Sequence, residues 1–144
     1  MREILFRGKK IDNGEWVYGF LSKSRDVKGK LSYCIDYEEK EVMCSSIVFP
    51  ETVGQYTGLT DKNGKKIFEG DILRLKRFGN IEWGKIVFNT NVAEFEFWRK
   101  VTVGAYGEKA TRKENLCAFT AATSYVDIRG NIHDNPELLE GVEK

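Results

Sequence analysis

Apolar and polar residues alternate in short runs along most of this chain, and glycine, asparagine and aspartate separate the runs. This pattern is typical of antiparallel strands that each bury one face. It predicts strands at residues 4–7, 15–20, 31–37, 42–49, 53–57, 72–76, 81–88, 93–97, 116–120 and 125–129. The turn cluster Asp12-Asn13-Gly14 falls between the first two, so we expect the N-terminus to form a β-hairpin.

One predicted strand changes phase along its length. Ile81 and Trp83 share one parity, whereas Ile86 and Phe88 have the other. A regular strand cannot point both pairs inward without an extra residue. We therefore predict a bulge or bend at Gly84.

Two further segments do not read as strands. Residues 104–115 are polar without any period, which is typical of a mobile loop or an extended hairpin tip. Residues 135–137 read Asn-Pro-Glu, a good N-cap followed by a residue suited to the first helical position and an acid that complements the helix dipole. This predicts a short C-terminal helix of one or two turns, docked by Leu138 and Leu139.

The length of 144 residues fits one ordinary domain, so we expect a single domain over residues 1–144. No linker rich in glycine, serine or proline divides it. If the chain divides at all, the break falls near Pro50, between an N-terminal β-unit at 1–50 and a barrel-like unit at 51–144.

Residues 55–72 are dense in turn chemistry. Residues 61–64 read Asp-Lys-Asn-Gly, a tight turn with Gly64 at the position that needs a positive φ. Glu69-Gly70-Asp71 is predicted to form a second turn, and an aspartate there accepts hydrogen bonds from backbone N–H groups. The three acids Asp61, Glu69 and Asp71 also suggest a carboxylate cluster for metal or acid–base chemistry. Each lies beside glycine or asparagine, so we favour the structural interpretation.

These turns resemble the core signature of the YopX family of phage and prophage proteins. The resemblance rests on residues 55–59 (QYTGL), 61–65 (DKNGK), 67–72 (IFEGDI), 6–9 (FRGK), 79–83 (GNIEW) and 130–139 (GNIHDNPELL). It implies a mainly β fold of several coiled antiparallel sheets, including an SH3-like barrel. Family members look like phage accessory proteins, and the family implies no activity, substrate or catalytic residue.

Composition restricts the function further. The net charge of +1 lacks the basic excess of a protein that wraps DNA, so nucleic-acid binding would need a local patch. Charged residues interrupt the N-terminus at once, and no apolar run is long enough for a bilayer, so we expect no membrane association. The three cysteines lack close spacing, which favours free thiols in the cytoplasm of a bacterial host.

The sequence offers no catalytic, cofactor or metal site. His133 is the only histidine, at a position where YopX proteins more often carry Tyr, and we expect it to pack or to face solvent. Cys34, Cys44 and Cys117 are too scattered for a structural zinc site. Cys34 and Cys44 can face each other across a hairpin, but we favour the interpretation that both are buried as small apolar residues.

Two groups of basic residues are the candidates for nucleic-acid contacts: Arg74, Lys76 and Arg77, and then Arg99, Lys100, Arg112 and Lys113, with Lys109 beside them. Aromatic residues lie close by, and a surface that mixes basic side chains with stacking rings can hold single-stranded nucleic acid. Glutamates are interspersed among both groups, which favours an ordinary solvated face instead.

Three hypotheses follow for the function. The first is a non-enzymatic binding or assembly module, in which part of the 12% aromatic content closes a homo-oligomer interface or meets a phage or host protein. The second is a nucleic-acid-binding small β-barrel protein, by analogy of fold. The third and least favoured is an enzyme, which would need a pocket with converging polar groups.

Overall fold

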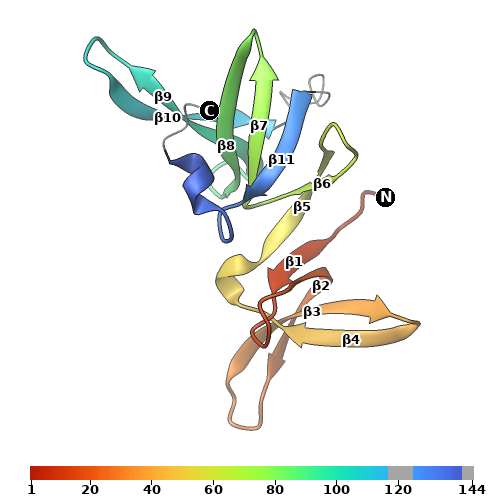
Figure 1. The fold of residues 1–144 in the computed structure, drawn as a ribbon. Helices are drawn as coiled ribbons and strands as arrows, with labels where there is room; N and C mark the ends of the chain where they lie inside the picture. Colours follow the sequence, from red (N-terminus) through yellow and green to blue (C-terminus); the bar gives the residue numbers. More distant parts are fainter. Residues whose placement is uncertain (117–124, 141–144) are drawn as a thin grey trace. The chain divides into compact units, whose positions relative to one another are not determined.

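The structure, a computed structural model, describes residues 1–116 and 125–140, and it is mainly β (Figure 1). The first sheet has the strand order β4-β3-β2-β1-β5-β6. Its strands are β1 (Phe6–Lys9), β2 (Trp16–Arg25), β3 (Leu31–Glu39), β4 (Val42–Ile47), β5 (Gly54–Thr60) and β6 (Lys66–Phe68). The second sheet has the order β10-β9-β8-β7-β11. Its strands are β7 (Asp71–Arg77), β8 (Asn80–Asn89), β9 (Glu94–Val103), β10 (Glu108–Asn115) and β11 (Val126–Asn131).

The chain forms two compact units, Met1–Gly58 and Leu59–Lys144, and the division falls within β5. Pro50, near which we expected any break, instead begins the 3₁₀ turn η1 (Pro50–Thr52). The N-terminal hairpin is confirmed as β1 and β2, although β1 starts two residues later than expected. The core of the first unit is small and centres on Val17, Ile35 and Val48.

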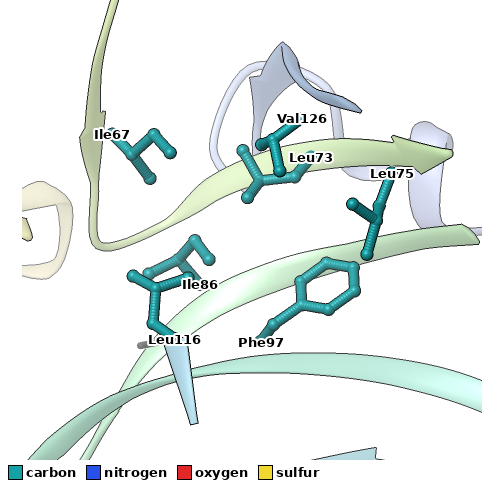
Figure 2. Packing of buried hydrophobic residues seen from close by; sticks show 7 residues of the cluster. All are labelled: Ile67, Leu73, Leu75, Ile86, Phe97, Leu116 and Val126. Carbon is teal, nitrogen blue, oxygen red and sulfur yellow. The ribbon is translucent and has the colours of Figure 1, made fainter. Parts of the chain in front are cut away.

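The second unit has the larger core. Strand β7 alternates apolar and basic residues from Leu73 to Lys76, so Leu73 and Leu75 point to the same side. Figure 2 shows this core, which also receives residues from β6, β8, β9 and β11. Its buried members are Ile67, Leu73, Leu75, Ile86, Phe97, Leu116 and Val126. The five-stranded sheet therefore packs one face on this core; we call the opposite face the outer face, although Ile72 on it is also buried.

The expected SH3-like barrel is not closed in the described residues. β11 pairs with β7 and β10 pairs with β9, so these two strands are the edges of an open sheet. Pairing between β8 and β9 ends at Lys85 opposite Trp98. Beyond that point β9 and β10 continue as a two-stranded ribbon, visible in Figure 1, so the sheet separates at this place.

The expected C-terminal helix is wrong in type. Residues Pro136–Leu139 form a single 3₁₀ turn, η3, rather than an α-helix. Asn135 does not cap it: its backbone has φ −133° and ψ 47°, and its side-chain oxygen accepts a hydrogen bond from the backbone N–H of Asn131. With the Asn135 side chain engaged elsewhere, the turn has no side-chain cap at its N-terminus. Leu138 and Leu139 are half-buried.

The expected bulge at Gly84 is also wrong. The β7–β8 register runs without a shift from Arg77 opposite Asn80 to Ile72 opposite Lys85. The change of phase needs no extra residue, because Ile81 and Trp83 lie on the outer face and do not point into the core. Gly84 has a different role, because a Cβ atom there would lie 2.4 Å from Cε2 of Phe97. The register shift occurs in β11 instead, between Ile128 and Gly130.

Residues 104–115 form an extended hairpin rather than a mobile loop, since β10 pairs along its whole length with β9. Most of the strand predicted at 116–120, together with Cys117, lies outside the described residues. In the part of the chain that the structure describes, no helix is long and apolar enough to cross a membrane.

Candidate functional site

Two aspartates of the 55–72 segment stabilise turns by accepting hydrogen bonds from backbone N–H groups. Oδ1 of Asp61 accepts hydrogen bonds from the backbone N–H groups of Asn63 at 2.8 Å and Lys65 at 2.9 Å. Its Oδ2 accepts one from Ile128 at 3.2 Å. Oδ2 of Asp71 accepts one from the backbone N–H of Phe68. Both aspartates are buried and used by the backbone, so the structural interpretation of this segment is confirmed for them.

The two described cysteines lie at different positions of the β3–β4 hairpin. Cys34 lies opposite Ile47 and Cys44 lies opposite Tyr37, so the two thiols do not face each other across the β3–β4 hairpin. Cys34 is buried, as expected for a small apolar residue, whereas Cys44, for which burial was also expected, is only half-buried. Within residues 1–116 and 125–140, no group of three or more His, Cys, Asp or Glu side chains is arranged to hold a metal ion.

The basic residues separate onto the two faces of the five-stranded sheet. Residues directly opposite each other on paired strands share a face, and so do alternate residues along one strand. The register pairs that place the outer residues are Arg74–Trp83, Lys76–Ile81, Lys85–Trp98, Trp98–Lys113, Lys100–Thr111 and Lys109–Thr102. We call the following set the basic face: Arg74, Lys76, Lys85, Lys100, Lys109 and Lys113 with the rings of Trp83 and Trp98.

Trp98 is the centre of the basic face. It lies directly between Lys85 of β8 and Lys113 of β10. The ammonium of Lys113 is 4.1 Å from the centroid of the Trp98 ring, and that of Lys85 is 6.0 Å from it. These are cation–π contacts, which hold both cations against the indole while leaving them charged. The row Lys85–Trp98–Lys113 therefore presents an indole ring with a positive charge on each side.

Two more lysines are fixed on the ribbon by cross-strand threonines. Nζ of Lys100 donates a hydrogen bond to Oγ1 of Thr111 at 3.0 Å. Nζ of Lys109 donates one to Oγ1 of Thr102 at 2.9 Å. A neutral hydroxyl orients an ammonium without neutralising it. The ribbon therefore extends the line of positive charge beyond Trp98.

The carboxylates on the outer face are occupied by neighbouring groups. Oε1 of Glu96 accepts hydrogen bonds from Nε1 of Trp98 at 3.0 Å and Nδ2 of Asn89 at 2.8 Å. The Trp98 hydrogen bond is the main reason that the pKa of Glu96 lies below its ordinary value, followed by the Asn89 bond. Asp127 pairs with Arg129 at 2.9 Å and with Lys62 at 3.8 Å.

Formal charge differs between the two faces of the sheet. Apart from Arg129, which pairs with Asp127 at the register shift of β11, the outer face carries the six basic residues of the basic face against three acids, Glu94, Glu96 and Asp127, a surplus of three positive charges. The core side carries three arginines, Arg77, Arg99 and Arg112, against four acids, Asp71, Glu82, Glu108 and Glu114. A chain of net charge +1 thus concentrates positive charge on one face.

On the core side, two arginines and two glutamates close a ring of ion pairs. Arg77 contacts Glu82 at 2.8 Å and Glu114 at 2.6 Å. Arg99 contacts Glu114 at 3.0 Å and Glu82 at 3.4 Å. Between 13% and 21% of each side chain is exposed. We call these four residues the ion-pair ring, and it connects β7 and β8 to the base of the ribbon.

The ring shifts the pKa values of its members. Burial alone would raise the pKa of Glu114, but hydrogen bonds and Coulomb attraction from Arg77 and Arg99 outweigh it and hold this pKa below its ordinary value. The hydrogen bond that Arg77 donates to Glu114 is the largest cause that raises the pKa of Arg77. Both arginines already have carboxylate partners within the ring.

The seven residues predicted to contact nucleic acid therefore lie on two different faces of the sheet. Arg74, Lys76, Lys100 and Lys113 lie on the outer face together. Arg77 and Arg99 belong to the ion-pair ring, and Arg112 is exposed on the core side opposite Arg99.

Basic residues that are close along the chain lie on both faces of the sheet, so the two predicted groups mixed the faces. Lys85 was absent from the prediction, because the bulge expected at Gly84 broke the parity that links Lys85 to Trp83. Strict alternation through that strand would have found it.

Comparison with known proteins places the chain in a family. The family model described as YopX protein matches residues 5–140. The chain belongs to the YopX protein family. No curated protein matches it. Among solved structures, protein EF1440 from Enterococcus faecalis is similar at 22% sequence identity, with a TM-score of 0.53, over 97% of this chain and 100% of that one. At this identity the likeness shows the fold alone.

Proposed function

We propose that this YopX protein is a non-enzymatic binding module that holds single-stranded nucleic acid on the basic face. The observation that carries the proposal is the row Lys85–Trp98–Lys113, an indole with cations on both neighbouring strands. Single-strand binders combine positive charge that follows the phosphate backbone with rings on which bases stack. The row supplies both in three side chains.

The rest of the basic face supports the same ligand. Arg74 lies directly opposite Trp83, which repeats the pairing of a cation with a half-exposed ring one strand away from Trp98. Lys100 and Lys109 continue the charge along the ribbon. Ammonium groups contact phosphates without reading sequence, so we expect little base preference.

The setting that we propose is that of a phage or prophage accessory protein acting in the cytoplasm of the bacterial host. The support is the resemblance of the signature at 55–72 to phage-borne YopX proteins. Free nucleic acid in single-stranded form is present during phage replication and transcription, so a ligand of this class is available there.

Fluorescence anisotropy with labelled oligonucleotides tests the proposal. Single-stranded DNA or RNA of about 20 nucleotides is expected to bind at low salt and to lose at least about ten-fold in affinity between about 50 mM and about 200 mM salt. Duplex DNA of the same length should bind more weakly, because its bases are not free to stack. Absence of binding to every oligonucleotide at low salt would remove the proposal, and tighter binding to duplex would assign the face to a different ligand.

A further inference from the structure

The tip of the β7–β8 hairpin is a two-residue turn made of Phe78 and Gly79. Arg77 pairs with Asn80 on either side of it, and both turn residues have a positive φ, 50° for Phe78 and 75° for Gly79. Hairpin turns with a positive φ at both positions strongly favour Asn-Gly, because asparagine tolerates this region of backbone conformation and a bulky residue does not. A phenylalanine at the first position therefore strains the turn.

The ring of Phe78 gives nothing back to the fold. The residue is 92% exposed, so its ring gains none of the favourable free energy of burial in the core. Of the four non-glycine residues with a positive φ in the part of the chain that the structure describes, Phe78 is the only aromatic one. Backbone strain that a fold retains is concentrated at sites that hold ligands. Phe78 therefore has the properties of a ligand contact.

Positive charge surrounds Phe78. Residues 72–81, which run through β7 and the turn into β8, contain three basic residues and no acid. Lys76, a member of the basic face, is exposed two residues before Phe78. The next acid along the chain, Glu82, pairs with Arg77 in the ion-pair ring. The tip therefore favours an anionic ligand.

Phe78 extends the basic face to the end of its hairpin. Trp83 lies opposite Arg74 on this hairpin, and Lys85 of the central row lies two residues beyond Trp83. Six residues separate Lys85 from Gly79, so about 20 Å separates the row from the tip. Even a strand whose bases remained stacked, at about 3.4 Å per nucleotide, would cover this distance with about six nucleotides. One short oligonucleotide can therefore reach both places.

Building on the proposed function, we propose that Phe78 stacks on an unpaired base of the strand held by the basic face, and that it thereby sets the preference of this face for single-stranded over duplex nucleic acid. A phenyl ring can stack on any base, and it adds affinity without adding a phosphate contact. In a duplex the bases already stack on one another, so the ring meets no free base.

Fluorescence anisotropy of the Phe78→Asn chain with three ligands of about 20 nucleotides tests the role of the ring. Its affinity for oligothymidine is expected to fall at least about five-fold, with the dependence on salt unchanged. Affinities for an abasic strand and for a duplex should stay as they are, because neither offers a free base. The melting temperature should rise by about 4 °C, because asparagine relieves the strain of the turn. A purely structural ring would lower it.

Two aromatic positions supply the controls. Phe78→Tyr keeps a ring at the tip and should bind oligothymidine as the unaltered chain does. Phe20→Asn makes the same substitution at an exposed phenylalanine of the first sheet, opposite Asp36. A carboxylate beside the ring disfavours a polyanion, so this variant should bind without loss.

The outcomes separate this inference from the proposed function. Unchanged oligothymidine affinity in Phe78→Asn, in a chain whose salt dependence falls in Lys113→Gln, would overturn the role of Phe78 and leave the basic face as the binding site. An equal loss of affinity for the abasic strand would also overturn it. Absence of binding by the unaltered chain would remove both proposals. Loss of binding to vesicles of phosphatidylserine and phosphatidylcholine in Phe78→Asn, with oligothymidine affinity unchanged, would assign the tip to a lipid surface instead.

Discussion

Nη2 of Arg77 lies 2.6 Å from Oε1 of Glu114, although two strands separate their own strands in the order of the sheet. In a flat sheet, β7 and β10 would be about 14 Å apart. The contact therefore requires the sheet to coil so that the β9–β10 ribbon turns toward β7. The ion-pair ring holds this coil at the point where β8 and β9 stop pairing.

Removing Glu114 should loosen the ribbon. Glu114→Ala takes away hydrogen bonds from Arg77 and Arg99 and leaves two half-buried guanidinium groups with one carboxylate. We expect a loss of about 2 kcal/mol in the free energy of unfolding, measured by urea denaturation, and faster amide exchange in the ribbon. Glu108→Ala, at an exposed position on the same strand, is the control. Equal losses in both variants would show that the ring does not fasten the ribbon.

Acid should destabilise the protein through the same carboxylate. The pKa of Glu114 is below its ordinary value of 4.5 in the folded state, so the unfolded chain binds this proton more readily. Its contribution is complete above about pH 4.5 and is lost as pH falls through the folded pKa. Glu96 acts in the same direction. In denaturation at pH values from about 5 to about 3, Glu114→Gln should show a shallower loss of stability; an unchanged slope would contradict the pKa assignment.

Asp61 should be the most sensitive acid of the signature segment. Asp61→Ala leaves three backbone N–H groups, those of Asn63, Lys65 and Ile128, without their acceptor. The expected cost is about 2–4 kcal/mol of unfolding free energy by thermal or urea denaturation. Lys62→Ala, in the same turn, removes only an ion pair of 3.8 Å whose lysine is exposed, and it should cost less than about 1 kcal/mol. The turn interpretation fails if the two variants are equally stable.

Gly84 should tolerate no side chain. A Cβ atom in Gly84→Ala would lie 2.4 Å from Cε2 of Phe97 and 2.5 Å from the backbone oxygen of Trp98. The backbone oxygen cannot move without disturbing the pairing of β8 with β9, so we expect a loss of about 2 kcal/mol or more. Ile81→Ala, at an exposed position of the same strand, serves as the comparison. A stable Gly84→Ala protein would mean that β9 approaches β8 less closely than described.

Local patterns made much of the fold predictable from the sequence. The alternation of apolar and polar residues predicted most strands. The Asp61 turn was predictable because aspartate and glycine each have a specific backbone role there. The type of the C-terminal turn was not predictable, because the Asn135 side chain accepts a hydrogen bond from the backbone N–H of Asn131, four residues earlier, and not from the turn that follows it; a capping rule does not contain this alternative. The coil of the sheet depends on Arg77 meeting Glu114 across 37 residues, which no local pattern reveals.

The basic face was predictable only in part, and the reason lies in neighbouring residues. Arg112 and Lys113 are adjacent in sequence, yet they point to opposite faces of β10 because strand side chains alternate. A basic cluster along a strand is therefore two clusters, one on each face. Which of the two clusters remains available for a ligand depended on the ion-pair ring, because its glutamates, from β8 and β10, pair with arginines of the core side.

The adjacent pair Arg112 and Lys113 gives the most direct test of nucleic-acid binding on the basic face. The measurement is the slope of log affinity for a single-stranded oligonucleotide against log salt concentration. Each phosphate contact contributes about 0.7 to this slope for single strands. Lys113→Gln is predicted to reduce the slope by about 0.7 and to weaken binding at low salt, whereas Arg112→Gln should leave both unchanged. Equal effects of the two substitutions, or a larger effect of Arg112→Gln, would contradict the account.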